Sequence, residues 1–143
     1  MGEIVVMAAG LLGSHHLTLE TVEAVSCADV VYHLVTGVEA QQRLRQLNPC
    51  VFSLVGFYQD GDLDLEVYGR IVSFLLAQAM ADRRVAFVVM GHPSIYVAPT
   101  HLLQEHGPRY GVPVRLLPAL SSIDTILSWL PFHIPNTGLQ ILD

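Results

Sequence analysis

The sequence contains no lysine. Its seven basic residues are all arginines, against 13 acidic residues, which gives a formal net charge of −6. Without lysine the chain can form neither the phosphate-binding lysine loop of nucleotide hydrolases nor a Schiff base with a carbonyl substrate. No stripe of basic residues runs along the chain, so nucleic acid is not expected as a partner.

Cysteine is nearly absent as well. Cys27 and Cys50 stand alone, without the C-x-x-C spacing of a redox or zinc motif. We expect them to be reduced, small and buried hydrophobic side chains. The seven histidines form no H-E-x-x-H motif and do not cluster with the cysteines, so the sequence predicts no metal site.

No hydrophobic run is long enough to cross a bilayer. The best candidate, residues 71–81, is interrupted by polar residues and closed by Asp82, Arg83 and Arg84, which favours a buried core helix. The N-terminus carries no positive charge before its apolar residues, so a secretory signal is not predicted. We therefore expect a cytoplasmic protein.

Charged residues make up only 14% of the chain, whereas 52% of residues are hydrophobic and the mean hydropathy is +0.47. A chain of 143 residues can bury one core. A compact monomer of this composition would still expose much apolar surface. The composition therefore predicts a homo-oligomer, at least a dimer, or a partner domain that covers this surface.

Short β-branched runs alternate with longer helical patterns, which predicts an α/β fold with a mainly parallel five-stranded sheet and helices on both faces. The expected strands are residues 3–8, 30–35, 50–55, 85–90 and 114–117. The expected helices are residues 17–26, 38–47, 63–82, 98–107 and 121–130. In the first helix, Leu19, Val22 and Val25 are expected to share one face, with Thr18 or a neighbour as the cap.

Three segments that follow predicted strands carry glycine, proline or small polar residues: 9–16, 91–96 and 118–122. Ligands of such folds bind beyond the carboxyl ends of the strands, so these segments are candidates for one shared site. Gly91 and Pro93 flank His92 and predict a sharp turn that a small molecule can approach; an ordinary strand-to-helix turn is the alternative.

The first of these loops has no complete G-x-G-x-x-G motif, so a dinucleotide site is weakly supported. His15 and His16 in this loop are expected to be solvated rather than to face a ligand.

Two tyrosines and four acidic residues surround the start of the 63–82 helix. Asp60, Asp62 and Asp64 resemble the opening of a calcium loop, but the later ligands are missing and negative charge at a helix N-terminus explains them better. Tyr58 and Tyr68 are candidates to orient or deprotonate a substrate group; packing is their alternative role.

The end of the chain has a different composition. Turn-forming residues at 131–138 precede an apolar run at 139–142. We expect one α/β domain over residues 1–130, followed over 131–143 by a linker and the first strand of a second domain.

Three stretches, "HLTLETVEAVSCADVVYHLVT" (16–36), "GHPSIYVAP" (91–99) and "LLPALSSIDTIL" (116–127), resemble the tetrapyrrole methylase family of class III S-adenosylmethionine-dependent methyltransferases. Within this family the chain is most similar to the borosin-type peptide backbone N-methyltransferases. The likeness covers the N-terminal domain of the family.

This resemblance implies S-adenosylmethionine as the cofactor, S-adenosylhomocysteine as its product, and a peptide backbone amide or another small acceptor as the substrate. It assigns Tyr58 and Tyr68 to catalysis. It assigns nine residues to cofactor binding: Met90, Gly91, His92, Pro93, Ile95, Tyr96, Val97, Ser121 and Ser122.

The chain departs from the family pattern at several positions. Asp64 stands where the peptide methyltransferases have an arginine, Met90 where they have a tyrosine, and Ala119 where they have a glycine. The resemblance covers the N-terminal domain alone and implies that a second domain completes the cofactor cleft, so the isolated chain is expected to be weakly active or inactive. A degenerate, non-catalytic module that dimerises or binds a peptide is the alternative function.

A third hypothesis is a flavodoxin-like domain for a phosphate-bearing ligand. It lacks support because no Ser/Thr-rich phosphate cradle opens the first helix.

Overall fold

The computed structural model describes residues 2–59, 61, 63–131 and 138–141, and its centre is a parallel five-stranded sheet. The strand order is β3-β2-β4-β1-β5, and every pairing is parallel. The strands are β1 (Glu3–Ala8), β2 (Val30–His33), β3 (Val51–Ser53), β4 (Arg84–Val89) and β5 (Val114–Leu116). The predicted five-stranded α/β sheet is confirmed, with strand ends that differ by no more than two residues from those expected.

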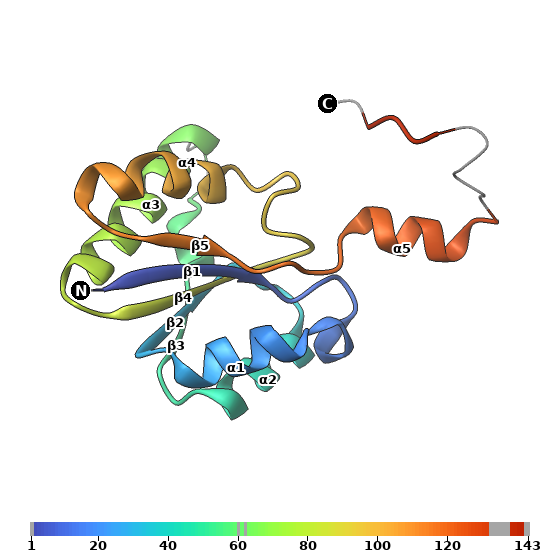
Figure 1. Ribbon diagram of the computed structural model, residues 1–143, viewed down its shortest axis with the longest axis horizontal. Coiled ribbons are helices and arrows are strands. Elements are labelled where there is room, and N and C mark those ends of the chain that lie inside the picture. The colour runs from blue at the N-terminus through green and yellow to red at the C-terminus, as the bar shows by residue number, and fades with distance from the viewer. Residues whose placement is uncertain (1, 60, 62, 132–137, 142–143) are drawn as a thin grey trace.

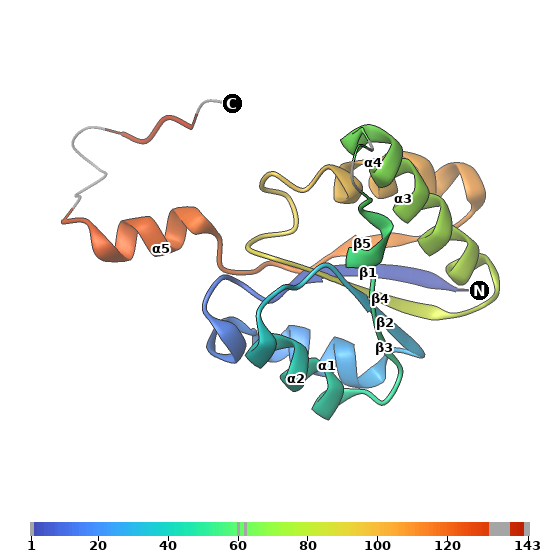
Figure 2. The same cartoon turned by 180° about the vertical axis from the view of Figure 1, so that it is seen from behind.

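Helices cover both faces of the sheet, as predicted. The α1 and α2 helices lie on one face, and α3 and α4 lie on the other (Figures 1 and 2). The α-helices are α1 (Leu19–Cys27), α2 (Val38–Leu47), α3 (Asp64–Met80), α4 (Ala98–His106) and α5 (Ser122–Trp129). Three short 3₁₀ turns, η1 (Gly13–His16), η2 (Val55–Phe57) and η3 (Gly107–Tyr110), complete the described elements. In Figure 1 the α5 helix extends away from the sheet, beyond the end of β5.

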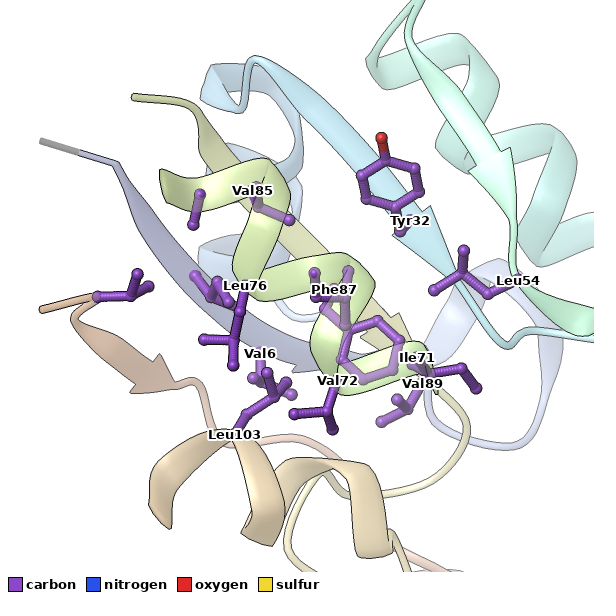
Figure 3. Packing of buried hydrophobic residues seen from close by; sticks show 14 of the residues in the cluster. Val6, Tyr32, Leu54, Ile71, Val72, Leu76, Val85, Phe87, Val89 and Leu103 are labelled. Carbon is purple, nitrogen blue, oxygen red and sulfur yellow. The ribbon is translucent and has the colours of Figure 1, made fainter. Parts of the chain in front are cut away.

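The central strands β1 and β4 are buried on both faces, which explains why their sequences are unbroken apolar runs. Successive side chains alternate between two hydrophobic clusters. Val6 and Phe87 pack with α3 and α4, whereas Met7 and Val88 pack with α1 and α2. Figure 3 shows Phe87 among the side chains of the first cluster.

The apolar stretch at 71–81 forms most of α3, as expected of a core helix. Ile71 and Leu75 are fully buried against the sheet. Among the described residues, no helix combines the length and the apolar character needed to cross a membrane.

The predicted apolar face of α1 is partly wrong. Leu19 is 83% exposed, while Thr21 and Val25 are fully buried and Val22 is half-buried. Thr18 is the N-cap, as expected, and its side-chain oxygen accepts a hydrogen bond from the Thr21 backbone N–H at 3.1 Å. This cap fixes the first turn so that Thr21 and Val25, one turn apart, face the sheet and Leu19 points outward.

The prediction of buried cysteines is also wrong: Cys27 and Cys50 are both exposed. Cys27 is the last residue of α1, where the helix leaves the sheet, and Cys50 precedes β3, the outermost strand on its side. Hydrophobicity alone does not distinguish such peripheral positions from core positions.

The acidic residues near α3 are placed as a helix start, not as a calcium loop. Asp64 and Glu66 lie in the first turn of α3, where negative charge is favourable. Asp60 and Asp62 lie outside the described residues. Residues 138–141 form neither helix nor strand and Leu142 lies outside the described residues, so the second domain predicted to begin there stays a prediction.

Candidate functional site

A cavity of about 330 Å³ lies at the carboxyl edge of the sheet, beyond the ends of β1, β2 and β4. Its wall combines the loop that follows β4 with side chains from α3 and from the start of α4 and α5. The lining residues are Leu11, Leu34, Tyr58, Tyr68, Val89, Met90, Gly91, His92, Ile95, Tyr96, Val97, Ala98, Pro99 and Ser122.

The cavity brings together most of the residues expected at the site. Both predicted catalytic tyrosines line it, as do seven of the nine predicted cofactor residues: Met90, Gly91, His92, Ile95, Tyr96, Val97 and Ser122. Pro93 and Ser121 are buried beside it and do not line it. The roles of all these residues stay predictions.

The sharp turn predicted at Gly91 is present. Gly91 has φ = +67° and Gly10 has φ = +63°, a conformation that glycine adopts without the strain of a side chain. The Gly91 N–H donates to the Gly10 carbonyl oxygen at 3.0 Å. This bridge joins the loops after β1 and β4 and shapes one wall of the cavity.

The hydrogen bond of His92 fixes its tautomer. The Ser94 backbone N–H donates to Nδ1 of His92 at 3.1 Å, so in the neutral ring the proton is on Nε2. Because His92 lines the cavity, this Nε2–H is a donor available to a ligand.

Ser121 acts as a cap rather than as part of the cavity wall. Its hydroxyl accepts hydrogen bonds from the backbone N–H groups of Ile123 and Asp124 and donates to Asp124 Oδ2 at 2.7 Å, while its own N–H donates to the same carboxylate. These bonds form a capping box at the start of α5 and lower the pKa of Asp124. Ser121 therefore positions Ser122, which does line the cavity.

Tyr58 and Tyr68 meet in the cavity with their ring centroids 6.5 Å apart and their planes at 74°. Tyr58 follows η2, and Tyr68 projects from the second turn of α3. Burial raises the pKa of Tyr58, and the neighbouring Tyr68 and Asp64 raise it further. The Tyr58 phenol therefore keeps its proton at neutral pH and can donate a hydrogen bond.

Tyr96 has a strained backbone. Its φ of +57° is in the left-handed region, which is unfavourable for a bulky residue, and its side chain is 71% exposed. Tyr96 lines this cavity and a second one of about 520 Å³, which is also lined by Tyr68, Ser94 and His101. Such strain is typical of ligand-contacting loops.

Sequence reasoning did not assign five lining residues individually: Leu11, Leu34, Val89, Ala98 and Pro99. Leu11 lies in the 9–16 segment that the strand-end rule already marks as a candidate, and Leu34 directly follows β2, so the same rule is the signal that could have identified it. Nothing in their chemistry distinguishes them from core residues.

His16 is half-buried and only partly solvated. Its Nδ1 accepts hydrogen bonds from the Leu11 and Leu12 N–H groups at 3.2 and 3.4 Å, and a Cβ on Gly10 would collide with its ring. His15 is exposed, as expected. In the part of the chain that the structure describes, no three His, Cys, Asp or Glu side chains come together to bind a metal ion.

Several curated proteins are similar to this chain. A methyltransferase/ribosomally synthesized type I borosin cyclic peptide precursor of Coprinopsis marcescibilis is 27% identical over 137 residues, which are 96% of this chain and 35% of the relative. A precursor of the same description from Mycena rosella is also 27% identical, over 95% of this chain and 34% of the relative. The chain therefore spans about a third of the length of these relatives.

Solved structures share the fold. Uroporphyrin-III-C-methyltransferase of Thermus thermophilus superposes with a TM-score of 0.71 at 22% identity, over 93% of this chain and 54% of that one. A putative diphthine synthase of Entamoeba histolytica superposes with a TM-score of 0.62 at 17% identity, over 88% of this chain and 44% of that one. The family model described as Tetrapyrrole (Corrin/Porphyrin) Methylases matches residues 3–142. The chain therefore belongs to the tetrapyrrole methylase family.

Proposed function

We propose that this chain forms one half of the active-site cleft of an S-adenosylmethionine-dependent methyltransferase, and that a second domain or a partner chain completes the cleft. The observation that carries the proposal is the cavity at the carboxyl edge of the sheet. It unites Tyr58, residues of the 90–97 loop and Ser122, which are far apart in the sequence and which the sequence alone predicts as site residues. Family membership favours this function over a phosphate-ligand domain.

The cavity suits part of the cofactor. Its volume of about 330 Å³ is at the lower end of the roughly 300–1,000 Å³ of small-molecule sites, so it can hold part of a nucleoside-bearing molecule. Val89, Ile95 and Val97 provide apolar walls for the methionine chain. The His92 Nε2–H and the Ser122 hydroxyl are the polar groups that would bind its charged end.

When bound, the cofactor supplies a methyl group activated by a sulfonium, so the protein needs mainly to align donor and acceptor. The Gly10–Gly91 bridge holds the loop that would carry this alignment. Tyr58 keeps its phenolic proton, so it can donate a hydrogen bond to the acceptor while Tyr68 orients it from the adjacent wall.

The similar curated proteins are described as methyltransferase/ribosomally synthesized type I borosin cyclic peptide precursors, which supports a peptide as the acceptor. Apolar side chains exposed on the surface favour an assembly in which a further domain or a second copy of the chain covers them. On α5, Trp129 is 71% and Ile126 47% exposed. Monomers rarely leave such residues together in water, so we expect an assembly, with a homodimer as the simplest one.

A non-catalytic binding module is the second candidate. The side chain of Met90 lines the cavity where the resemblance places a tyrosine, which leaves that position without a hydrogen-bonding group. Such a module would retain the fold and the apolar surface but would not hold the cofactor.

Native mass spectrometry with and without S-adenosylhomocysteine tests the proposal, because it reports assembly and occupancy together. We expect a ligand-bound oligomer. Ile95→Trp should fill the cavity and lower occupancy about tenfold or more, which corresponds to roughly 1.4 kcal/mol. Tyr110→Trp is the matched control, since Tyr110 is exposed on η3 and lines neither this cavity nor its neighbour. A folded chain that stays unliganded at millimolar ligand would instead favour the binding module.

A further inference from the structure

The candidate cavity is unusually rich in aromatic rings and poor in positive charge. Three of its 14 lining residues are tyrosines, and none is an arginine. An aromatic ring carries partial negative charge on its face and attracts a cation placed within about 6 Å of its centroid. Several rings that face one space form a site for an organic cation.

The Tyr58 and Tyr68 rings have the geometry of two adjoining walls. Their planes are nearly perpendicular, at 74°, and their centroids are 6.5 Å apart. A cation in the corner between them can lie within contact distance of both rings. Tyr96 lines the same cavity and offers a third ring.

A carboxylate stands next to this corner. Asp64 is the first residue of α3 and lies one helical turn before Tyr68, so the two share a helix face. Its charge also acts on Tyr58 and is one of the causes that raise the pKa of that phenol. Asp64 therefore places negative charge near Tyr58 and on the helix face of Tyr68.

The arginine that follows Tyr68 in α3 hydrogen-bonds the backbone before Tyr58. Arg70 lies two residues after Tyr68, on a different side of α3, and its Nη2 donates to the Phe57 carbonyl oxygen at 3.1 Å. The carboxylate of Asp64 is thus the charge that shares a helix face with the tyrosine.

We propose that Tyr58, Tyr68 and Asp64 form a binding site for an organic ammonium or sulfonium cation at the edge of the cavity. The site belongs to the proposed methyltransferase cleft and rests on that function. Two sources share this chemistry: a protonated amino group of the acceptor and the sulfonium of the cofactor. An acceptor recognised here carries an amine, which distinguishes it from one presenting only neutral amides.

The test compares two probes of equal shape, choline and its neutral isostere 3,3-dimethyl-1-butanol, by NMR titration of the tyrosine ring signals of the full chain. We expect choline to bind about five- to tenfold more tightly, as cation–π attraction and one carboxylate imply. Asp64→Asn should remove most of this preference. Glu66→Gln is the matched control, because it deletes an equal charge in the same turn of α3 two residues away.

Two further variants distinguish the contribution of the aromatic ring of Tyr68 to cation binding from that of its hydroxyl group. Tyr68→Phe should keep the preference for choline because the π face remains, whereas Tyr68→Leu should lose it. The dispersion of the NMR signals shows whether each variant is folded. Because Asp64 is exposed, the Asp64→Asn comparison stands even if the leucine variant does not fold.

Equal affinity for the two probes would overturn the inference, and so would equal effects of Asp64→Asn and Glu66→Gln. Repeating the titration with saturating S-adenosylhomocysteine distinguishes the sources. Choline that still binds identifies a site for the acceptor amine, and choline that is displaced identifies the place of the sulfonium. If the chain binds S-adenosylhomocysteine but does not prefer choline, this inference alone fails; if it does not bind S-adenosylhomocysteine, the proposed function fails.

Discussion

The backbone N–H of Gly91 donates a hydrogen bond to the carbonyl oxygen of Gly10 across 3.0 Å, and both residues have positive φ. This contact connects two loops that are 81 positions apart in the sequence. It lies where β1 and β4 end, at the edge of the sheet that carries the candidate cavity. The two glycines have the same conformation but different surroundings.

We predict that Gly10→Ala is far more damaging than Gly91→Ala. Both variants force alanine into the left-handed region, at a cost of about 1–2 kcal/mol. A Cβ on Gly10 would also collide with His16, whereas the nearest atom to a Cβ on Gly91 is 3.9 Å away. We expect losses of unfolding free energy of about 3 kcal/mol or more for Gly10→Ala and about 1 kcal/mol for Gly91→Ala.

Urea unfolding measures both values. Gly37→Ala is the control, since Gly37 has φ = −70° and no atom within 4 Å of an added Cβ. Equal losses at Gly10 and Gly91 would contradict the packing of His16 beneath the first loop.

Ser121→Ala should weaken the start of α5. It removes the hydroxyl that caps Ile123 and Asp124, a loss of about 0.5–2 kcal/mol. Because Ser122 follows directly and lines the cavity, we also expect weaker binding of S-adenosylhomocysteine by calorimetry. Ser128→Ala on the same helix, where the hydroxyl is exposed and bonds only to the Asp124 carbonyl, should change neither quantity appreciably.

The sheet could be predicted from the sequence because its strands are buried on both faces. Runs such as β1 and β4 must then be continuously apolar, and the helices between them carry their own periodicity. Periodicity does not determine which helix positions face the sheet, so Leu19 was misplaced. It also does not show that Cys27 and Cys50 lie at the periphery.

The site could be predicted only in part. The 91–97 loop was identifiable from its turn residues, and the tyrosine pair from resemblance to a family. Leu11 was covered only through the candidate segment 9–16, and Leu34 was missed, because the strand order β3-β2-β4-β1-β5 determines which strand ends meet at the cavity. Strand order arises from tertiary contacts and leaves no local signal in the sequence.

His33 should make stability depend on pH. The side chain is fully buried on β2, and its Nδ1 accepts a hydrogen bond from the Val35 N–H at 3.2 Å. Burial lowers the pKa of His33, and the positive charge of Arg45 lowers it further. The folded protein therefore resists a proton that the unfolded chain accepts.

The direction in which stability changes with pH follows from this difference in pKa between the folded and the unfolded chain. Above the unfolded pKa of about 6.5 the contribution of His33 to stability is complete, and as the pH falls below it stability decreases by up to about 1.4 kcal/mol per pH unit. His33→Asn should be less stable at pH 7.5 and should lose this slope, as measured by urea unfolding between pH 7.5 and 5. An unchanged slope in the variant would assign the pH dependence to another group.

Asn48 should be the most sensitive polar residue of the α1–α2 layer. It is buried at the end of α2, where its Nδ2 donates to the carbonyl oxygens of Val25 and Ala28 at 2.8 and 2.9 Å, and its Oδ1 accepts from the Cys50 N–H at 2.8 Å. These bonds connect the end of α1 to the start of β3.

Asn48→Ala would remove the partner of the Ala28 carbonyl oxygen and of the Cys50 N–H, whereas the Val25 carbonyl oxygen would keep its bond from the Ala28 N–H. A buried polar group left unpaired costs about 1–3 kcal/mol. We expect a loss of roughly 2–4 kcal/mol in thermal or urea unfolding, while Gln46→Ala, at an exposed position on the same helix, should cost less than about 0.5 kcal/mol. Asn48→Asp keeps the acceptor for the Cys50 N–H but places a carboxylate against two carbonyl oxygens, so it should be at least as destabilising as alanine at neutral pH. A tolerated Asn48→Asp would mean that the bond to Cys50, rather than the bonds to α1, holds this layer together.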